Sequence, residues 1–238
     1  MSSAHLDVWP VLAAGELEVL GLLPRSSNYT FLARASAGED STLVVYKPRR
    51  GETPLWDFPE GTLCQREVAA YVVARELGWP DIPPTLLRDG PEGEGSVQLF
   101  VEFDPARHYF TMFEERPDDF RRVAAFDMVV NNADRKSGHC LCSTDDRVFV
   151  VDHGVCFSTE PKLRTVIWEF AGEPIPPELR EDARRVAAGL AGGGLRTEMA
   201  GLLDEAEIDA TARRALLVAE AERFPHPTGE RPYPWPPV

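Results

Sequence analysis

The spacing of apolar residues changes once along this chain, and the change limits what the chain can fold into. Before Asp104, short runs of β-formers alternate with turn-forming residues, a pattern typical of a small antiparallel sheet. After Asp104, apolar residues recur at helical intervals. We therefore expect an α+β chain whose β-rich N-terminal half joins a helical C-terminal half near residues 100–105. The strand runs lie at 17–23, 29–35 and 41–48, followed by a strand, turn and strand over 82–103.

One helix interrupts the β-rich half. Thr62 and Gln65 form the pattern of a capping box, an apolar stripe follows at helical spacing, and Gly78 is a suitable stop. Glu67 flanks that stripe, so we expect its side chain to point toward the sheet rather than into water. Lys47 ends the third strand run, where a lysine departs from the chain's strong preference for arginine as its cation.

The net charge of −14 at pH 7 excludes several classes of partner. Sequence-independent binding of nucleic acid requires a basic footprint, and docking on an anionic membrane uses clustered lysine and arginine. The basic clusters at 120–122 and 183–185 are short. We therefore expect no nucleic-acid partner and no membrane partner, while a partner protein stays open.

The cysteines and the N-terminal residues indicate in which cellular compartment the protein is expected. The four cysteines are too few and too clustered for a disulfide framework, which favours a reducing environment. No apolar run approaches the roughly 18 residues that a membrane span needs. The N-terminus has neither the basic start nor the long apolar stretch of a secretory signal. We expect a cytoplasmic protein with enough residues for a sizeable core.

The stretch NNADRKSGHC, residues 131–140, places many reactive side chains on one connection before an apolar hairpin. If residues 144–147 form the turn, His139 lies opposite Asp152. Directly opposed residues of an antiparallel pair have Cβ atoms ~4.5–5.5 Å apart. The hairpin thus returns Asp152 to the end of the loop that contains Asp134. Oxygen-bearing side chains that converge in this way can share a metal ion.

Simpler interpretations of these residues stay open. Asp152 can be a strand-end aspartate before a turn glycine, and Asp134 with Arg135 can be a solvated loop pair. Either is reasonable when the residues are considered singly. The predicted convergence of the loop with the strand end favours a functional site.

The order of these features resembles a known family. A lysine ends an apolar strand, a glutamate lies on an early helix, a D-R-x-x-G-H loop follows a long helix, and a strand leads into Asp-His-Gly. This order is similar to the atypical kinases related to phosphoinositide 3- and 4-kinases, especially the type II phosphatidylinositol 4-kinase and HipA-type branches. The segments concerned are YKPRRGE, REVAAYVVARELG, NNADRK and VVDHGVCF.

The resemblance implies a two-lobed protein-kinase-like fold that forms one domain overall. It implies a β-rich nucleotide-binding lobe over residues 1–103, a helical catalytic lobe over 104–226, and a Pro-rich tail over 227–238. It also implies an enzyme, an ATP-dependent phosphotransferase that uses Mg²⁺ or Mn²⁺. Because the acidic chain shows no basic surface for a lipid bilayer, we expect the acceptor to be a protein or small-molecule hydroxyl.

The resemblance assigns the nucleotide-binding residues to the N-terminal half. Lys47 would contact the α- and β-phosphates, and Glu67 would orient that lysine. Ser26 and Ser27 lie where the fold places its phosphate-covering loop and would bind phosphate oxygens. Glu102 belongs to the hinge strand whose backbone would meet the adenine.

The resemblance assigns the transfer chemistry to the later loop. Asp134 would align the acceptor hydroxyl and take up its proton, and Lys136 would neutralise charge on the transferring group. Asp152 would ligate the metal ion. The family usually has an asparagine as second metal ligand five residues after the catalytic aspartate, and His139 occupies that position here. Imidazole suits Mn²⁺ or Zn²⁺ better than Mg²⁺.

Two other functions stay open. With histidine in place of asparagine, the chain can be a nucleotide-binding regulator, a pseudokinase whose ATP state a partner recognises. The second is a zinc-binding protein, because two cysteines of one strand share a face, although C-x-x-C pairs are missing. The candidate zinc ligands are His139, Cys140, Cys142, His153 and Cys156.

Overall fold

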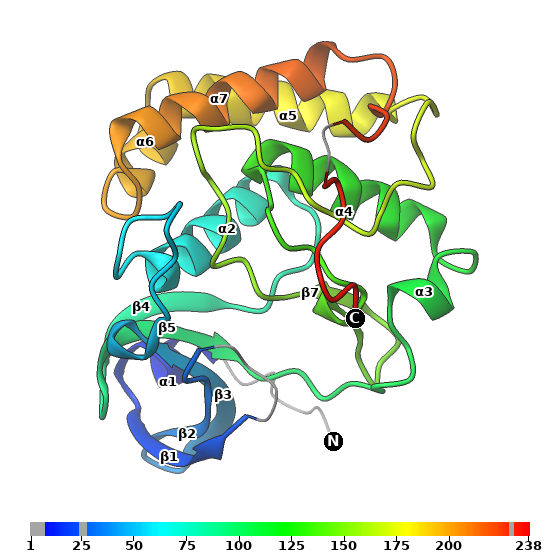
Figure 1. Ribbon diagram of the computed structural model, residues 1–238. Helices are drawn as coiled ribbons and strands as arrows, with labels where there is room; N and C mark the ends of the chain where they lie inside the picture. Colours follow the sequence, from blue (N-terminus) through cyan, green and yellow to red (C-terminus); the bar gives the residue numbers. More distant parts are fainter. Residues whose placement is uncertain (1–7, 24–27, 229–230) are drawn as a thin grey trace, which may run out of the picture. The chain divides into compact units, whose positions relative to one another are not determined.

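A computed structural model describes residues 8–23, 28–228 and 231–238 (Figure 1). The chain divides into two compact units. The first holds residues 1–68 and 83–101, and the second holds residues 69–82 and 102–238. The boundary at residue 103 that the sequence predicts stays a prediction.

The first unit is built on an antiparallel sheet of five strands in the order β1-β2-β3-β5-β4 (Figure 1). The predicted strand runs overlap the observed strands, although their ends differ by up to a few residues, which confirms the β-rich N-terminal half. The 3₁₀ turn η1 (Arg49–Gly51) follows β3. The strands are β1 (Glu16–Leu22), β2 (Phe31–Ala37), β3 (Asp40–Pro48), β4 (Thr85–Gly90) and β5 (Gly93–Leu99).

The core of this unit lies between the sheet and the short helix α1 (Val8–Ala14). Val44 and Tyr46 of β3 are fully buried in it. Successive side chains of a strand point to opposite faces, so Lys47 lies on the other face of β3. The period-2 pattern of the sequence thus decides on which side of the sheet the lysine lies.

The helix α2 (Leu63–Leu77) begins in the first unit. Its first N–H groups need acceptors, and the Glu52 carboxylate accepts from Leu63 at 3.1 Å and from Cys64 at 2.8 Å. The sequence pattern predicts Thr62 as the cap, but its hydroxyl donates to a backbone carbonyl oxygen at 2.8 Å. Glu52 is eleven residues upstream of Leu63, beyond the local pattern on which capping-box assignments rely.

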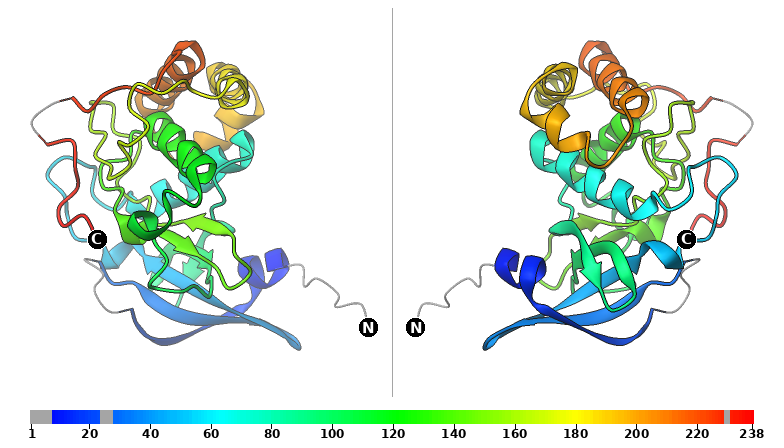
Figure 2. Two further views of the ribbon diagram at one scale, coloured as in Figure 1. Left: turned by 90° about the vertical axis from the view of Figure 1, so that its right-hand side faces the viewer. Right: turned by 90° about the vertical axis from the view of Figure 1, so that its left-hand side faces the viewer.

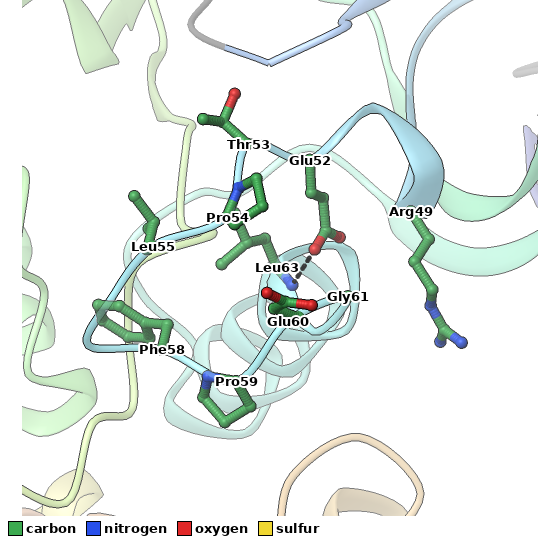
Figure 3. A pocket seen from close by; sticks show the side chains of 10 residues that line it. All are labelled: Arg49, Glu52, Thr53, Pro54, Leu55, Phe58, Pro59, Glu60, Gly61 and Leu63. Atoms are coloured by element: carbon green, nitrogen blue, oxygen red, sulfur yellow. Dashed lines mark hydrogen bonds between the residues drawn. The ribbon is translucent and has the colours of Figure 1, made fainter.

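A pocket of about 180 Å³ lies beside this helix start (Figure 3). Glu52 points from the segment before the helix toward the amide of Leu63, and Phe58 and Pro59 line the opposite side (Figure 3). The carboxylate of Glu52 already accepts from two N–H groups of the helix. We therefore assign no ligand to this pocket.

The second unit is mostly helical, as the sequence predicts. The helix α7 packs against both α5 and α4, and in both views of Figure 2 the orange α7 lies beside the yellow α5. None of the helices in the described part of the chain has the length and apolar content that crossing a membrane would take. The helices are α3 (Tyr109–Met112), α4 (Pro117–Val130), α5 (Pro177–Ala191), α6 (Gly194–Met199) and α7 (Glu205–Glu220).

A small hairpin of β6 (Cys140–Cys142) and β7 (Val148–Val150) follows the 3₁₀ turn η2 (Ser137–His139). The predicted register is wrong by one residue, because the carbonyl oxygen of His139 accepts from Val151, not Asp152, at 3.0 Å. The turn is one residue shorter than predicted, since Asp146 adopts a left-handed backbone (φ 64°) that closes a three-residue loop. The expected approach of the hairpin end to the loop is nevertheless observed.

Candidate functional site

Lys47 and Glu67 form an ion pair within the first unit. Lys47 comes from β3 and Glu67 from the second turn of α2, and the glutamate side chain is only 4% exposed. A carboxylate this deeply buried requires a cationic partner, because an isolated buried charge costs several kcal/mol. The expected direction of the Glu67 side chain is confirmed, while the role of the pair toward a nucleotide stays a prediction.

Two asparagines tie the loop after α4 to the rest of the second unit. Asn131 ends the helix with a left-handed backbone (φ 53°). Its side chain donates to the carbonyl oxygens of Ser158 and Glu160 at 2.9 and 2.7 Å. The side-chain oxygen of Asn132 accepts from the backbone N–H of Asp134 at 3.0 Å. These bonds hold Asp134 in a defined position at the start of the loop.

The carboxylate of Asp134 lies 3.0 Å from the ammonium group of Lys136. Burial raises the pKa of the Asp134 carboxyl and Lys136 partly offsets this, while the Asp152 carboxylate adds to the increase. The Asp134 side chain keeps 32% of its surface exposed. An accessible carboxylate with a raised pKa is better suited to accept a proton than an ordinary surface aspartate.

A buried network lies beneath this loop. The guanidinium of Arg135 is fully buried and donates to Asp127 of α4, with Nε at 3.0 Å from Oδ2 and Nη2 at 3.0 Å from Oδ1. Asn132 donates to the same carboxylate at 3.0 Å. The alternative in which Arg135 is solvated is therefore wrong. Asp127 was not predicted as part of the site, although an acid on the apolar face of a helix is a signal of a buried partner.

The same guanidinium holds both neighbours of Asp152. It donates to the carbonyl oxygen of Val151 at 3.0 Å, and its Nη2 lies 2.7 Å from Nε2 of the fully buried His153. Asp152 has a left-handed backbone (φ 64°), which is uncommon for a residue other than glycine. Its side chain is 53% exposed. One buried cation thus orders the segments that present both Asp134 and Asp152.

His139 contacts Asp152 despite the shifted register. Its Nε2 lies 3.3 Å from Oδ2 of Asp152, and its Nδ1 accepts from the backbone N–H of Lys136 at 3.3 Å. A neutral imidazole that accepts at one nitrogen carries its proton on the other, so in this arrangement His139 donates to Asp152. Ligation of a metal by Nε2 would require the ring proton to move to Nδ1.

Three further residues were predicted to bind the nucleotide, and the structure describes only one of them, Glu102. The strand β5 ends at Leu99, so the expected position of Glu102 on that strand is wrong. The carbonyl oxygen of Glu102 accepts from the N–H of Thr144 at 3.2 Å. Ser26 and Ser27 lie outside the described residues. The structure therefore brings together Lys47 with Glu67 in the first unit, and the loop and strand-end residues in the second. The assigned roles of these residues stay predictions.

The zinc interpretation finds no support in the second unit. Cys140 is fully buried, and burial raises the pKa of its thiol to about 12. Cys142 and Cys156 are also buried. Among residues 8–23, 28–228 and 231–238, no group of three or more His, Cys, Asp or Glu side chains could hold a metal ion.

Comparison with curated proteins shows three relatives. Protein Rv2133c of Mycobacterium tuberculosis is 43% identical over 265 aligned positions, which cover 97% of this chain and 95% of the relative. Phosphatidylinositol 4-kinase gamma 4 of rice is 29% identical over 66% of this chain, and that of Arabidopsis thaliana is 26% identical over 54%. The aligned parts span only 35% and 28% of those plant proteins. No family model matches.

Comparison with solved structures shows the fold. The crystal structure of the Helicobacter pylori proinflammatory kinase CtkA superposes with a TM-score of 0.52 at 11% sequence identity, over 88% of this chain and 93% of that one. The kinase-like α+β fold expected from the sequence is confirmed. The expected relationship to phosphatidylinositol 4-kinases is confirmed as a distant one.

Proposed function

We propose that this chain, which belongs to the same family as the mycobacterial protein Rv2133c, transfers the γ-phosphoryl group of ATP to a hydroxyl of a protein or small molecule. The kinase-like fold and the distant similarity to phosphatidylinositol 4-kinases support a phosphotransferase. The observation that favours this function most is the ordering of the segments of Asp134 and Asp152 by the buried guanidinium of Arg135.

In the proposed reaction the acceptor oxygen forms a bond to the γ-phosphorus while the bond from that phosphorus to the β–γ bridging oxygen breaks, and ADP leaves. Asp134 aligns the hydroxyl and takes up its proton, which its accessible carboxylate and raised pKa favour. Lys136 lies 3.0 Å from Asp134 and is close enough to neutralise charge that develops on the transferring group.

The donor set near Asp152 fits a divalent metal ion. Mg²⁺ is held by one or two carboxylates together with substrate phosphates and water, so a cluster of three protein ligands is not required. The exposed carboxylate of Asp152 supplies a hard oxygen ligand. When bound, the ion neutralises charge on the phosphate oxygens. The role of His139 as a second metal ligand stays a prediction, and its present contact orients Asp152.

We assign the phosphates of ATP to Lys47, which Glu67 orients. Lys47→Met should therefore weaken ATP binding about 10- to 100-fold, because a charged hydrogen bond contributes ~1.5–3 kcal/mol. Calorimetric titration with ATP and Mg²⁺ measures this change. Arg34→Met, which removes the cation of a surface ion pair with Glu18 on the same sheet, is the matched control and should bind ATP like the wild type. Equal affinities of the Lys47 variant and the wild type would reject the assignment.

Thermal unfolding tests the metal–nucleotide site. At a hundred times its dissociation constant, ATP with Mg²⁺ or Mn²⁺ adds ~2.7 kcal/mol of stability, a rise in the midpoint of about 5–11 °C for a chain of this size. Asp152→Ala should remove the part of this rise that depends on the metal. Asp118→Ala, at an exposed position of α4, should keep the whole rise. A rise in Asp152→Ala equal to that of the wild type would contradict the metal assignment.

A nucleotide-binding regulator without turnover is the second candidate, and His139 in place of the family's asparagine favours it. Both functions predict that ATP with a metal ion raises the unfolding midpoint, but only the phosphotransferase transfers the phosphoryl group. A chain that binds ATP with metal but transfers no phosphate to water, protein or small molecules would be the regulator.

A further inference from the structure

The Pro-rich C-terminal tail lies against the loop that contains Asp134. The described part of the tail is RPYPWPPV, residues 231–238, drawn in red at the label C in Figure 1. Four of its eight residues are prolines, which have no backbone N–H. The tail therefore presents mainly carbonyl oxygens, and the second unit must supply the donors that hold it.

Three donors of the second unit hold two tail carbonyls. The oxygen of Pro232 accepts from the backbone N–H of Thr165 at 3.1 Å and from the indole Nε1 of Trp168 at 3.2 Å. The oxygen of Pro237 accepts from the backbone N–H of Ser137 at 2.9 Å. An indole that donates to a carbonyl oxygen of a proline-rich segment fits the use of aromatic side chains in the recognition of such segments. We call these three donors the tail seat.

The tail seat belongs to the same framework as Asp134. Ser137 follows Asp134 by three residues, and its side chain is fully buried. Ser137 belongs to the loop of Asp134, and Thr165 forms a parallel bridge with Arg135 of the same loop. Two of the three donors of the tail seat are therefore tied to this loop.

The tail is held through its backbone rather than through its large side chains. The side chain of Trp235 is 88% exposed and that of Tyr233 is 53% exposed, whereas Pro234 is buried. A segment that is recognised by carbonyl oxygens and proline rings can be replaced by another proline-rich segment, because the exposed aromatic side chains add few contacts. Each proline also has its φ angle fixed by its ring, so a proline-rich segment loses less backbone freedom on binding than other segments do.

We propose that the tail seat is the docking site for a proline-rich segment of the protein acceptor, and that the chain's own tail occupies it in competition. The proposal rests on the proposed phosphotransferase function, because it selects a protein over a small molecule as the acceptor. A tethered tail acts at an effective concentration in the millimolar range, so it would exclude segments that bind with micromolar affinity until they are abundant or the tail is released.

Peptide binding tests the seat independently of activity. A chain ending at residue 228 should bind the synthetic peptide RPYPWPPV at least tenfold more tightly than the full chain, measured by calorimetry. Trp168→Phe in the shortened chain keeps an aromatic ring but removes the indole donor, and should weaken peptide binding about 2- to 10-fold.

Phosphorylation of a serine peptide flanked by prolines should be several-fold faster in the shortened chain, and added RPYPWPPV should suppress it.

A second variant covers the case in which the shortened chain does not fold. The full chain with Pro232→Gly and Pro234→Gly keeps every tail carbonyl but loses the proline rings that restrict the tail backbone, so its tail should compete less well and the added peptide should bind several-fold more tightly than to the wild type. If a folded variant that still gains stability from ATP binds no peptide, the docking site is refuted while the phosphotransferase proposal stands. If ATP gives no stability to either chain but the peptide still binds, the phosphotransferase proposal fails and the seat remains as a peptide site.

Discussion

Asp134→Asn should lower phosphoryl transfer by about 100- to 10,000-fold, the range over which a positioned proton acceptor contributes to catalysis. The amide keeps the shape of the side chain and still contacts the acceptor hydroxyl, but it cannot take up the proton. The backbone N–H of Asp134 donates to Asn132 in either case, so the loop should keep its conformation. The affinity for ATP should be unchanged. Single-turnover transfer from radiolabelled ATP measures the first quantity, and calorimetric titration the second.

The matched control is Asp118→Asn, an exposed aspartate of α4 in the same unit, whose side chain is 84% exposed. It should transfer phosphate at the wild-type rate. Unchanged transfer in Asp134→Asn would remove this residue from the mechanism. A loss of both transfer and ATP binding would also contradict the assignment, because it would place Asp134 in nucleotide binding or in folding.

Arg135→Met should destabilise the chain by about 3–5 kcal/mol, because it leaves the fully buried carboxylate of Asp127 without its cation. For a chain of this length the unfolding midpoint should fall by roughly 6–20 °C. Methionine has a similar length, so the loss reflects the unpaired charge more than a cavity. Thermal and urea unfolding measure the effect.

Two further variants separate the buried pair from ordinary ion pairs. Arg122→Met removes one partner of a surface pair with Asp119 on α4 and should leave the midpoint within about 2 °C of the wild type. The double replacement Asp127→Leu with Arg135→Met removes both charges and should recover part of the lost stability, since apolar residues can replace a buried pair. The recovery should be incomplete because Asn132 and the carbonyl oxygen of Val151 lose their partners. A single Arg135→Met variant as stable as the wild type would contradict the role of the network.

Local patterns were sufficient for the parts of the site that lie on regular elements. Alternation along β3 puts Lys47 on the face opposite Val44 and Tyr46, and helical spacing along α2 puts Glu67 beside the apolar stripe. Both patterns have short periods, so the sequence displays them directly. The pairing of Lys47 with Glu67 then follows when strand and helix pack together.

The hairpin shows where local reasoning reaches its limit. The approach of Asp152 to His139 was predictable from two apolar runs around a polar turn, and the side chains do meet at 3.3 Å. The register was wrong because the turn closes with three residues instead of four, and the left-handed backbone of Asp146 decides this. Several turn types fit the same four polar residues, so their sequence did not select one.

By itself, the sequence determined the β-rich and helical halves through short-range periodicity. Its resemblance to the atypical kinases, carried by the order of the motifs, gave the kinase-like fold and the candidate residues Lys47, Glu67, Asp134 and Asp152. The helices α1 and α3 were not predicted. Only the tertiary structure decided that Arg135 is buried against Asp127 rather than solvated, and that the tail lies against Ser137, a hundred residues earlier in the chain. Such contacts depend on the path of the whole chain, since a donor and an acceptor far apart in sequence leave no repeating pattern in either segment.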